Sequence, residues 1–209
     1  MAGELEALMT RYCDGDAGAF RTLYARAAPA LRAFLVRLTG DRATADDMLQ
    51  ATFLKVHAAR GAYVRGADPM PWLYAIAHRT TLDELRRRKR SRKRFSSNDD
   101  ENPVEEPAAL SGKRLAEDDA DAGDPEIASA AIAALATLPE NQRTALVLTK
   151  LEGRSIAEAA EITGSTSGAI KLRAHRAYVA LRARLGNTRA EARGESPHGV
   201  ATRPGGRSP

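Results

Sequence analysis

The stretch SIAEAAEITGSTSGAIKLRAHRAYVALRARL, from Ser155 to Leu185, has the pattern of two helices joined by a tight turn. Ser155 and Glu158 form an S-x-x-E capping box, which predicts the start of the first helix. Gly164 supplies the turn, because glycine readily adopts the backbone conformation that ends a helix. Three consecutive residues then offer N-caps for the second helix: Ser165, Thr166 and Ser167.

The second of these helices carries two different faces. Apolar residues at three- and four-residue spacing predict a buried face: Ile170, Ala174, Ala177, Tyr178 and Leu181. The opposite face is basic and holds no acidic residue; its members are Lys171, Arg173, His175, Arg176, Arg182 and Arg184. These side chains donate to phosphates and purine edges, so the pattern favours a helix-turn-helix that enters the major groove of DNA. A merely structural hairpin with a solvated basic face is the alternative.

Composition narrows the class of protein. The 209 residues have a sequence pI near 9.6 but a formal net charge of only +5, because basic and acidic residues are segregated along the chain. No run reaches the roughly 18 apolar residues that a membrane span requires, and the N-terminus has no signal-peptide pattern, so we expect a cytoplasmic protein. Cys13 is the single cysteine and excludes an internal disulfide. We expect no metal and no cofactor, because the four histidines lie far apart in sequence.

Residues 1–94 are predicted to form a compact helical domain. Amphipathic segments follow one another: a short helix over Leu5–Tyr12, a long one that ends at Gly40 with Pro29 as a kink or break, a third opened by a capping box at Thr44–Asp47, and a fourth that begins near Pro71. In the third helix, Met48, Leu49, Phe53 and Val56 are expected to point inward and Asp46, Asp47, Gln50 and Lys55 outward.

The fourth helix ends in the run Arg86–Arg94, in which every residue except Ser91 is basic. A solubilising terminus or a charged linker would explain an isolated run of this kind. Because a helix-turn-helix shares the chain, a second contact with the same polyanion is the interpretation that we favour.

The rest of the chain divides into three segments. Residues 95–124 are rich in Asp, Glu, Ser and Pro and are predicted to be a disordered acidic linker. Residues 125–186 are predicted to form a four-helix unit that contains the helix-turn-helix, and residues 187–209 a disordered tail. The expected fold is therefore all-α, with two small helical domains joined by a flexible acidic linker.

Three stretches resemble the ECF (extracytoplasmic function) sigma factors of the sigma-70 family, which direct core RNA polymerase to promoters. GDAGAFRTLYARAAPALRAFLVRLTGDRATADDMLQATFLKV and PWLYAIAHRTTLDELRRRKR are similar to sigma domain 2, and LPENQRTALVLTKLEGRSIAEAAEITGSTSGAIKLRAHRAYVALR is similar to sigma domain 4. As in the ECF group, nothing resembles a domain 3. The resemblance implies a transcription initiation factor with no enzymatic activity, no cofactor and no small-molecule substrate.

The resemblance also implies roles for individual residues. The β′ clamp of core polymerase would be met by Asp46, Asp47, Gln50 and Phe53. The −10 promoter element would be captured and melted by Tyr63, Val64, Arg65, Trp72, Arg79, Arg86, Arg87 and Arg88. The −35 element would be contacted by Lys171, Leu172, Arg173, His175 and Arg176. Domain 4 would also meet the β flap, the acidic linker would thread the RNA exit path, and an anti-sigma factor, soluble or membrane-bound, would hold the chain inactive.

The sequence departs from the family at the melting helix, and other functions stay open. Ala77-His78-Arg79 stands where the family usually has Ala-Arg-Asn, so a polar contact of that Asn is lost. An operator-binding regulator would need a ligand pocket or a dimerisation seam in the N-terminal segment, and neither is evident. A nucleic-acid enzyme such as a recombinase would need ordered carboxylates, whereas many acidic residues here lie in the predicted linker.

Overall fold

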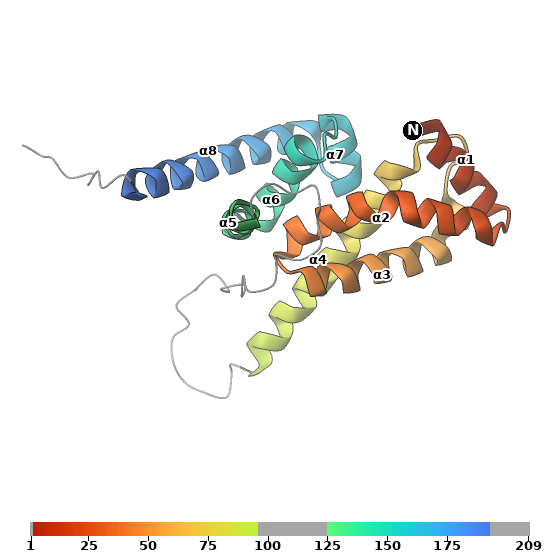
Figure 1. Ribbon diagram of the computed structural model, residues 1–209, viewed down its shortest axis with the longest axis horizontal. Coiled ribbons are helices and arrows are strands. Elements are labelled where there is room, and N and C mark those ends of the chain that lie inside the picture. The colour runs from red at the N-terminus through yellow and green to blue at the C-terminus, as the bar shows by residue number, and fades with distance from the viewer. Residues whose placement is uncertain (1, 96–124, 193–209) are drawn as a thin grey trace, which may run out of the picture.

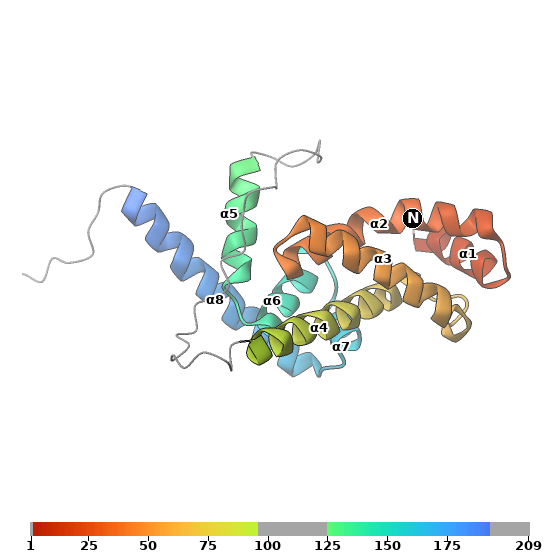
Figure 2. The ribbon, with the colours of Figure 1, turned by 90° about the horizontal axis from the view of Figure 1, so that it is seen from below.

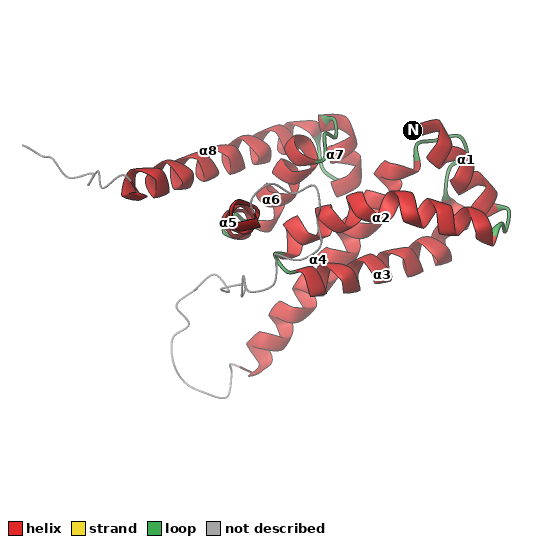
Figure 3. Ribbon diagram, viewed as in Figure 1, coloured by secondary structure: helices red, strands yellow, loops and turns green. Residues whose placement is uncertain are grey.

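The computed structural model describes residues 2–95 and 125–192. Within these two ranges the chain forms helices joined by short connections and no strand, as Figures 1 and 3 show. The predicted all-α class is therefore confirmed. The predicted acidic linker and most of the predicted C-terminal tail fall on residues 96–124 and 193–209, which lie outside the described residues. No described helix is long and apolar enough to span a membrane.

The first set of helices, here called the N-terminal module, packs around its second helix. Its elements are α1 (Ala2–Cys13), α2 (Ala17–Thr39), α3 (Arg42–Ala59), the 3-10 turn η1 (Arg60–Ala62) and α4 (Pro69–Phe95). Helix α2 contacts each of the other three helices. It contributes fully buried Leu23, Leu31, Phe34 and Leu35, and the ring of Phe34 meets that of Tyr74 on α4 edge-on, with centroids 5.0 Å apart. Burial of these large apolar side chains is the main stabilising contribution.

Aspartates fix where α2 and α3 begin. The Asp16 side chain accepts a hydrogen bond from the Ala19 N–H, and Asp41 accepts one from the Thr44 N–H at 2.8 Å. The predicted capping box at Thr44–Asp47 is therefore wrong. Asp41 is a strong N-cap residue, so α3 starts three residues earlier and Thr44 becomes a buried first-turn residue.

Pro29 lies within α2 and does not end the helix. Proline removes one backbone donor, and the carbonyl left without its partner belongs to Ala25. Both residues are exposed, so water can satisfy that carbonyl. This position explains why Pro29 does not break α2, which runs from Ala17 to Thr39.

The second set of helices, here called the C-terminal module, carries the helix-turn-helix. Its elements are α5 (Pro125–Ala136), α6 (Glu140–Leu146), the π-helical continuation η3 (Val147–Leu151), α7 (Ile156–Thr163) and α8 (Ser167–Ala192). Helix α8 continues through Gly186, beyond the predicted boundary at residue 186, and ends at Ala192.

The two modules pack directly against each other. Helix α7 contacts α4, and α5 contacts α2, so a single hydrophobic cluster runs through both modules. Figure 2, seen from below, shows α4 beside α7, with α8 extending away from this junction. Polar groups also cross the boundary: a guanidinium nitrogen of Arg143 donates to the carbonyl of Leu38 at the end of α2.

Candidate nucleic-acid interface

The helix-turn-helix has the predicted local geometry. The Glu158 N–H donates to the Ser155 hydroxyl at 3.1 Å, and the Ser155 N–H donates to the Glu158 carboxylate at 2.8 Å, so the capping box is complete. Hydrogen bonds from Ser155 lower the pKa of Glu158. Gly164 ends α7 with a φ of 63°, a left-handed conformation that favours glycine. Thr166 caps α8 by accepting from the Ala169 N–H.

The exposed face of α8 is basic at its N-terminal end. Lys171, His175 and Arg176 are exposed, and Leu172 between them is 49% exposed. Arg173 differs, because its guanidinium turns back and donates to the Ser165 hydroxyl at 2.7 Å. The structure therefore groups four of the five residues predicted for the −35 element on open surface, and it places Arg173 as a support of the turn.

The buried face of α8 is shorter than predicted. Ile170, Ala174 and Ala177 are buried, whereas Tyr178 is 54% exposed and Leu181 is half-buried. The prediction of a buried Tyr178 is wrong, because more than half of this side chain is exposed.

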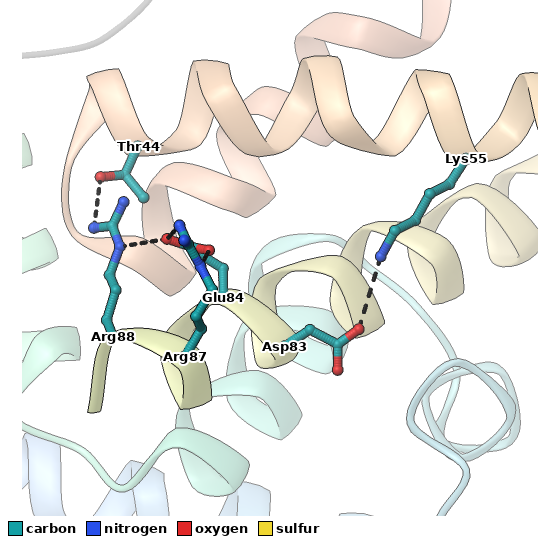
Figure 4. Close-up of polar contacts among 6 residues, drawn as sticks. All are labelled: Thr44, Lys55, Asp83, Glu84, Arg87 and Arg88. Carbon is teal, nitrogen blue, oxygen red and sulfur yellow. Dashed lines mark hydrogen bonds and ion pairs between the residues drawn. The ribbon is translucent and has the colours of Figure 1, made fainter. Parts of the chain in front are cut away.

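At the basic end of α4, two arginines converge on one carboxylate (Figure 4). Arg87 donates to Glu84 through Nε at 2.7 Å and through Nη2 at 2.9 Å, and Arg88 donates through Nε at 2.8 Å. Arg88 also donates to the Thr44 hydroxyl at 3.1 Å, which ties α4 to the start of α3. The hydrogen bonds from Arg87 and Arg88 lower the pKa of Glu84 to about 2, so this carboxylate is ionised at neutral pH.

Not all of the predicted DNA-contacting arginines on α4 share this surface. Arg79 is exposed. Arg86 lines a pocket between the modules together with His78 and Leu82 from α4 and Arg173 from α8. Burial, followed by the charges of Arg79 and Arg86, lowers the pKa of His78 to about 4, so this ring is neutral at neutral pH. One of the two residues at which the sequence departs from the family, His78, thus lies at the junction of the modules.

The loop that precedes α4 is anchored by its tyrosine. Tyr63 is 7% exposed, its hydroxyl donates to the Ala67 carbonyl, and its ring lies 5.7 Å from that of half-buried Trp72. The loop presents Val64, 72% exposed, to solvent, and Arg65 pairs with Asp14 at 2.6 Å. Tyr63 is therefore a buried support of the loop, Val64 and Arg65 are its accessible residues, and Trp72 lies half-buried beside Tyr63 in the first turn of α4.

The outer face of α3 is acidic and polar. Asp46, Asp47 and Gln50 are all exposed, and Asp46 accepts hydrogen bonds from Arg32 of α2 at 2.6 and 3.1 Å. Phe53 differs from its predicted role, because it is only 5% exposed and its ring lies 4.6 Å from that of Tyr24. It supports this face from beneath.

Three residues that join the modules were not identified from the sequence. Glu152, in the connection before α7, accepts a hydrogen bond from Arg37 of α2 and another from Tyr74 of α4. These partners are 115 and 78 residues away, so no local pattern indicates them. The Glu84 cluster was also missed, although its three- and four-residue spacing to the arginines is a recognised helix pairing.

Comparison with known proteins places both modules in one family. Residues 23–91 match the model for Sigma-70 region 2, and residues 129–181 match the model for Sigma-70, region 4. The chain is 38% identical over 183 residues to the RNA polymerase sigma factor CarQ of Myxococcus xanthus, which covers 88% of this chain and 98% of that protein. The chain belongs to the ECF sigma factors of the sigma-70 family. This sigma factor is also 36% identical over 182 residues to the ECF RNA polymerase sigma factor SigF of Caulobacter vibrioides, covering 87% of this chain and 93% of that one.

Solved structures show the same arrangement of helices. The sigma factor RpoE, in a complex with the anti-sigma factor NepR from Bartonella quintana, aligns with a TM-score of 0.60 and 28% identity over 80% of this sigma factor and 96% of that chain. CnrH, in a complex with the cytosolic domain of CnrY, aligns with a TM-score of 0.64 at 23% identity over 88% and 98% of the two chains, which supports the fold alone. The family establishes a role in transcription initiation.

Proposed function

We propose that this sigma factor binds core RNA polymerase, carries it to promoters with a −10 and a −35 element, and opens the DNA at the first of these. The observation that carries the proposal is the exposed basic end of α8, which follows a complete capping box and a glycine turn in a chain related to sigma factors over both modules. Such a chain works in the cytoplasm, where polymerase is.

The outer face of α3 is the proposed contact with the β′ clamp. Asp46, Asp47 and Gln50 are exposed, and Arg32 holds the Asp46 carboxylate in one orientation. Packing does not explain these polar side chains, because the residues that fill the core from α3 lie on its opposite face: Met48, Leu49, Thr52, Phe53 and Val56. The C-terminal module is proposed to meet the β flap.

The loop before α4 and the exposed arginines of α4 are the proposed −10 surface. Extruding a base from a duplex costs a few kcal/mol, which a pocket and a cationic platform must offset. Val64 and Trp72 offer apolar and aromatic surface for an unstacked base, while Tyr63 holds the loop in shape. Arg79 and the basic run supply the cationic part.

The exposed end of α8 is the proposed −35 reader. Lys171, His175 and Arg176 donate to base edges or phosphates, and Leu172 can contact a thymine methyl group. Because Arg173 is held by Ser165, we assign it to orientation of the helix. A good bidentate contact with a base is worth about 1–3 kcal/mol of discrimination.

An anti-sigma factor is the proposed regulator, because the RpoE relative was solved in complex with one. A groove of about 790 Å³ lies between α2, α3 and α5, and its lining is largely apolar: Tyr24, Ala28, Pro29, Val36, Leu49, Ala128, Ile132, Leu135 and Leu151. Asp46 and Arg32 lie at the same groove. A partner helix seated there would therefore cover part of the proposed polymerase surface.

A pull-down with bacterial core RNA polymerase tests the proposal. We expect the purified chain to co-elute with core enzyme, and a variant carrying Asp47→Ala and Gln50→Ala to be depleted from the complex. Arg182→Ala, an exposed change far from α3, is the control and should co-elute normally. A chain that binds duplex DNA but ignores core enzyme would instead be an operator-binding regulator.

A further inference from the structure

Helix α4 carries two acidic residues, and they are neighbours at the start of its basic run. Asp83 and Glu84 are the only acidic residues within Pro69–Phe95. Their surroundings differ: the Asp83 side chain is 68% exposed and meets Lys55 at 3.7 Å, whereas the Glu84 side chain is only 13% exposed. Figure 4 shows Arg87 and Arg88 closing over Glu84 while Asp83 points toward α3.

The two arginines on Glu84 are held to different degrees. Arg88 is fixed from two sides, by the carboxylate and by the Thr44 hydroxyl. Arg88 therefore joins α4 to α3. Arg87 is 73% exposed, and the hydrogen bonds described for its side chain both end on Glu84.

The contact on Arg87 uses the edge of the guanidinium that also grips phosphate. Nε and Nη2 form a planar fork that matches either a carboxylate or a phosphate, but it serves one of them at a time. Because the Arg87 side chain is 73% exposed, its pairing with Glu84 contributes little to stability. The pairing with Glu84 mainly changes the local net charge. Glu84 with the two arginines has a net charge of +1, whereas the arginines alone would have +2.

We propose that Glu84 acts as an internal phosphate mimic in the N-terminal module and withholds Arg87 from the DNA backbone. This inference rests on the proposed function, because it concerns the same DNA surface. Phosphate contacts raise affinity for every sequence alike, so withholding one lowers the affinity for promoter and non-promoter DNA by the same factor. Glu84 thus limits how tightly the chain is held on non-promoter DNA, while the ratio of specific to non-specific affinity stays with the base-reading groups.

The test compares Glu84→Gln with Asp83→Asn in the full chain, binding to a fluorescein-labelled duplex of random sequence. Both substitutions raise the net charge by one, on adjacent residues of one helix, but only the first releases Arg87. Each phosphate neutralised steepens the plot of log K against log salt by about 0.9. We expect Glu84→Gln to steepen that slope by about one unit and to raise affinity several-fold at low salt, and Asp83→Asn to leave the slope unchanged.

Arg87→Ala completes the cycle. It should leave the salt slope of the unsubstituted chain nearly unchanged and should abolish the steepening in the Glu84→Gln background. Equal slopes for Glu84→Gln and Asp83→Asn would overturn the inference, as would a marked loss of slope for Arg87→Ala alone, a measurement that stays valid even if Glu84→Gln fails to fold. A chain that binds no duplex at any salt would overturn the inference but not the proposed function, because the pull-down with core RNA polymerase and promoter binding of the holoenzyme test that function separately.

Discussion

Glu152 and Tyr74 form a hydrogen bond across the boundary of the two modules, with 2.7 Å between the Tyr74 hydroxyl and a carboxylate oxygen. Arg37 donates to the other oxygen at 2.5 Å. The Glu152 side chain is 7% exposed, and the guanidinium of Arg154 lies 5.1 Å from the centre of the Tyr74 ring. Burial, together with the hydrogen bond to Glu152, raises the pKa of Tyr74. These groups hold α4 and the helix-turn-helix side by side.

This closed arrangement constrains DNA binding. Two elements centred about 25 base pairs apart are separated by roughly 85 Å of B-form DNA. Arg86 of α4 and Arg173 of α8 line one pocket, so the N-terminal part of α8 and the DNA-facing helix α4 lie much closer together than that. The proposed function therefore requires the modules to separate. Breaking the contacts of Glu152 contributes to the free energy that this separation costs.

Glu152→Ala should favour the separated state. The change leaves the half-buried Arg37 guanidinium unpaired, and we expect it to weaken the contact between the modules by about 1–3 kcal/mol. Small-angle X-ray scattering should show a larger radius of gyration than for the unsubstituted chain. Glu161→Ala removes the same charge from an exposed position on α7 and should not change it. An unchanged radius for both variants would contradict the assigned role of Glu152.

Arg143→Met should destabilise the chain. The half-buried Arg143 side chain donates to the carbonyls of Ala136 and Leu138 at the end of α5 and to that of Leu38 in the other module. Methionine fills similar space but leaves these acceptors without their donor, so we expect a loss of about 2 kcal/mol or more in urea unfolding. Arg143→Lys, which keeps the charge but not the planar fork, should lose nearly as much. A loss below roughly 0.5 kcal/mol would show that water replaces the guanidinium.

Substitutions on α8 and α3 should separate DNA recognition from polymerase binding. Lys171→Ala and Arg176→Ala should each weaken promoter-specific binding of the holoenzyme by about 1–3 kcal/mol and leave its assembly intact. The Asp47→Ala and Gln50→Ala pair should do the reverse. Electrophoretic mobility shift and size-exclusion chromatography measure the two properties separately. Loss of both properties in an α8 variant would mean that α8 is structural.

Stability should fall in mild acid because of His78. Its folded-state pKa of about 4 lies below its ordinary value of 6.5, so between these values the unfolded chain binds more protons. The contribution of the neutral ring is fully present above pH 6.5 and is lost as the pH falls toward 4, at up to roughly 1.4 kcal/mol per pH unit.

Cationic groups outnumber carboxylates around His78. Arg79 and Arg86 come from α4 itself, and the pocket wall from the other module offers Arg173 of α8 and one carboxylate, Glu140 of α6. His78→Asn cannot take up a proton, so its free energy of unfolding should depend less on pH over this range than that of the unsubstituted chain. Parallel curves for the two chains would show that His78 titrates normally.

Local chemistry explains why the helix-turn-helix could be predicted from sequence. Ser155, Glu158 and Gly164 act within a few residues of themselves, so their spacing determines the turn whatever else packs on it. The start of α3 was predicted wrongly although it too depends on local chemistry. Asp41 and Thr44 are both good N-cap residues, and Asp41, the stronger of the two, caps the helix.

Packing between distant segments could not be predicted in full. Phe53 and Tyr178 were both expected to be buried from equivalent apolar patterns, and Phe53 is 5% exposed as predicted, whereas Tyr178 is 54% exposed. Their burial depends on where neighbouring helices end, which periodicity does not specify. No sequence pattern indicates the role of Glu152 either, because its partners come from the other module. Packing between helices that are distant in sequence thus determines which side chains of each proposed surface are exposed and how the two modules contact each other.

Run-off transcription with core RNA polymerase, from a library of promoter fragments, tests the central claim most directly. The account predicts transcripts that start at a defined subset of fragments only when this chain is present, and that share two sequence elements at fixed spacing upstream. Transcripts that are absent, or that appear equally from every fragment, would contradict it.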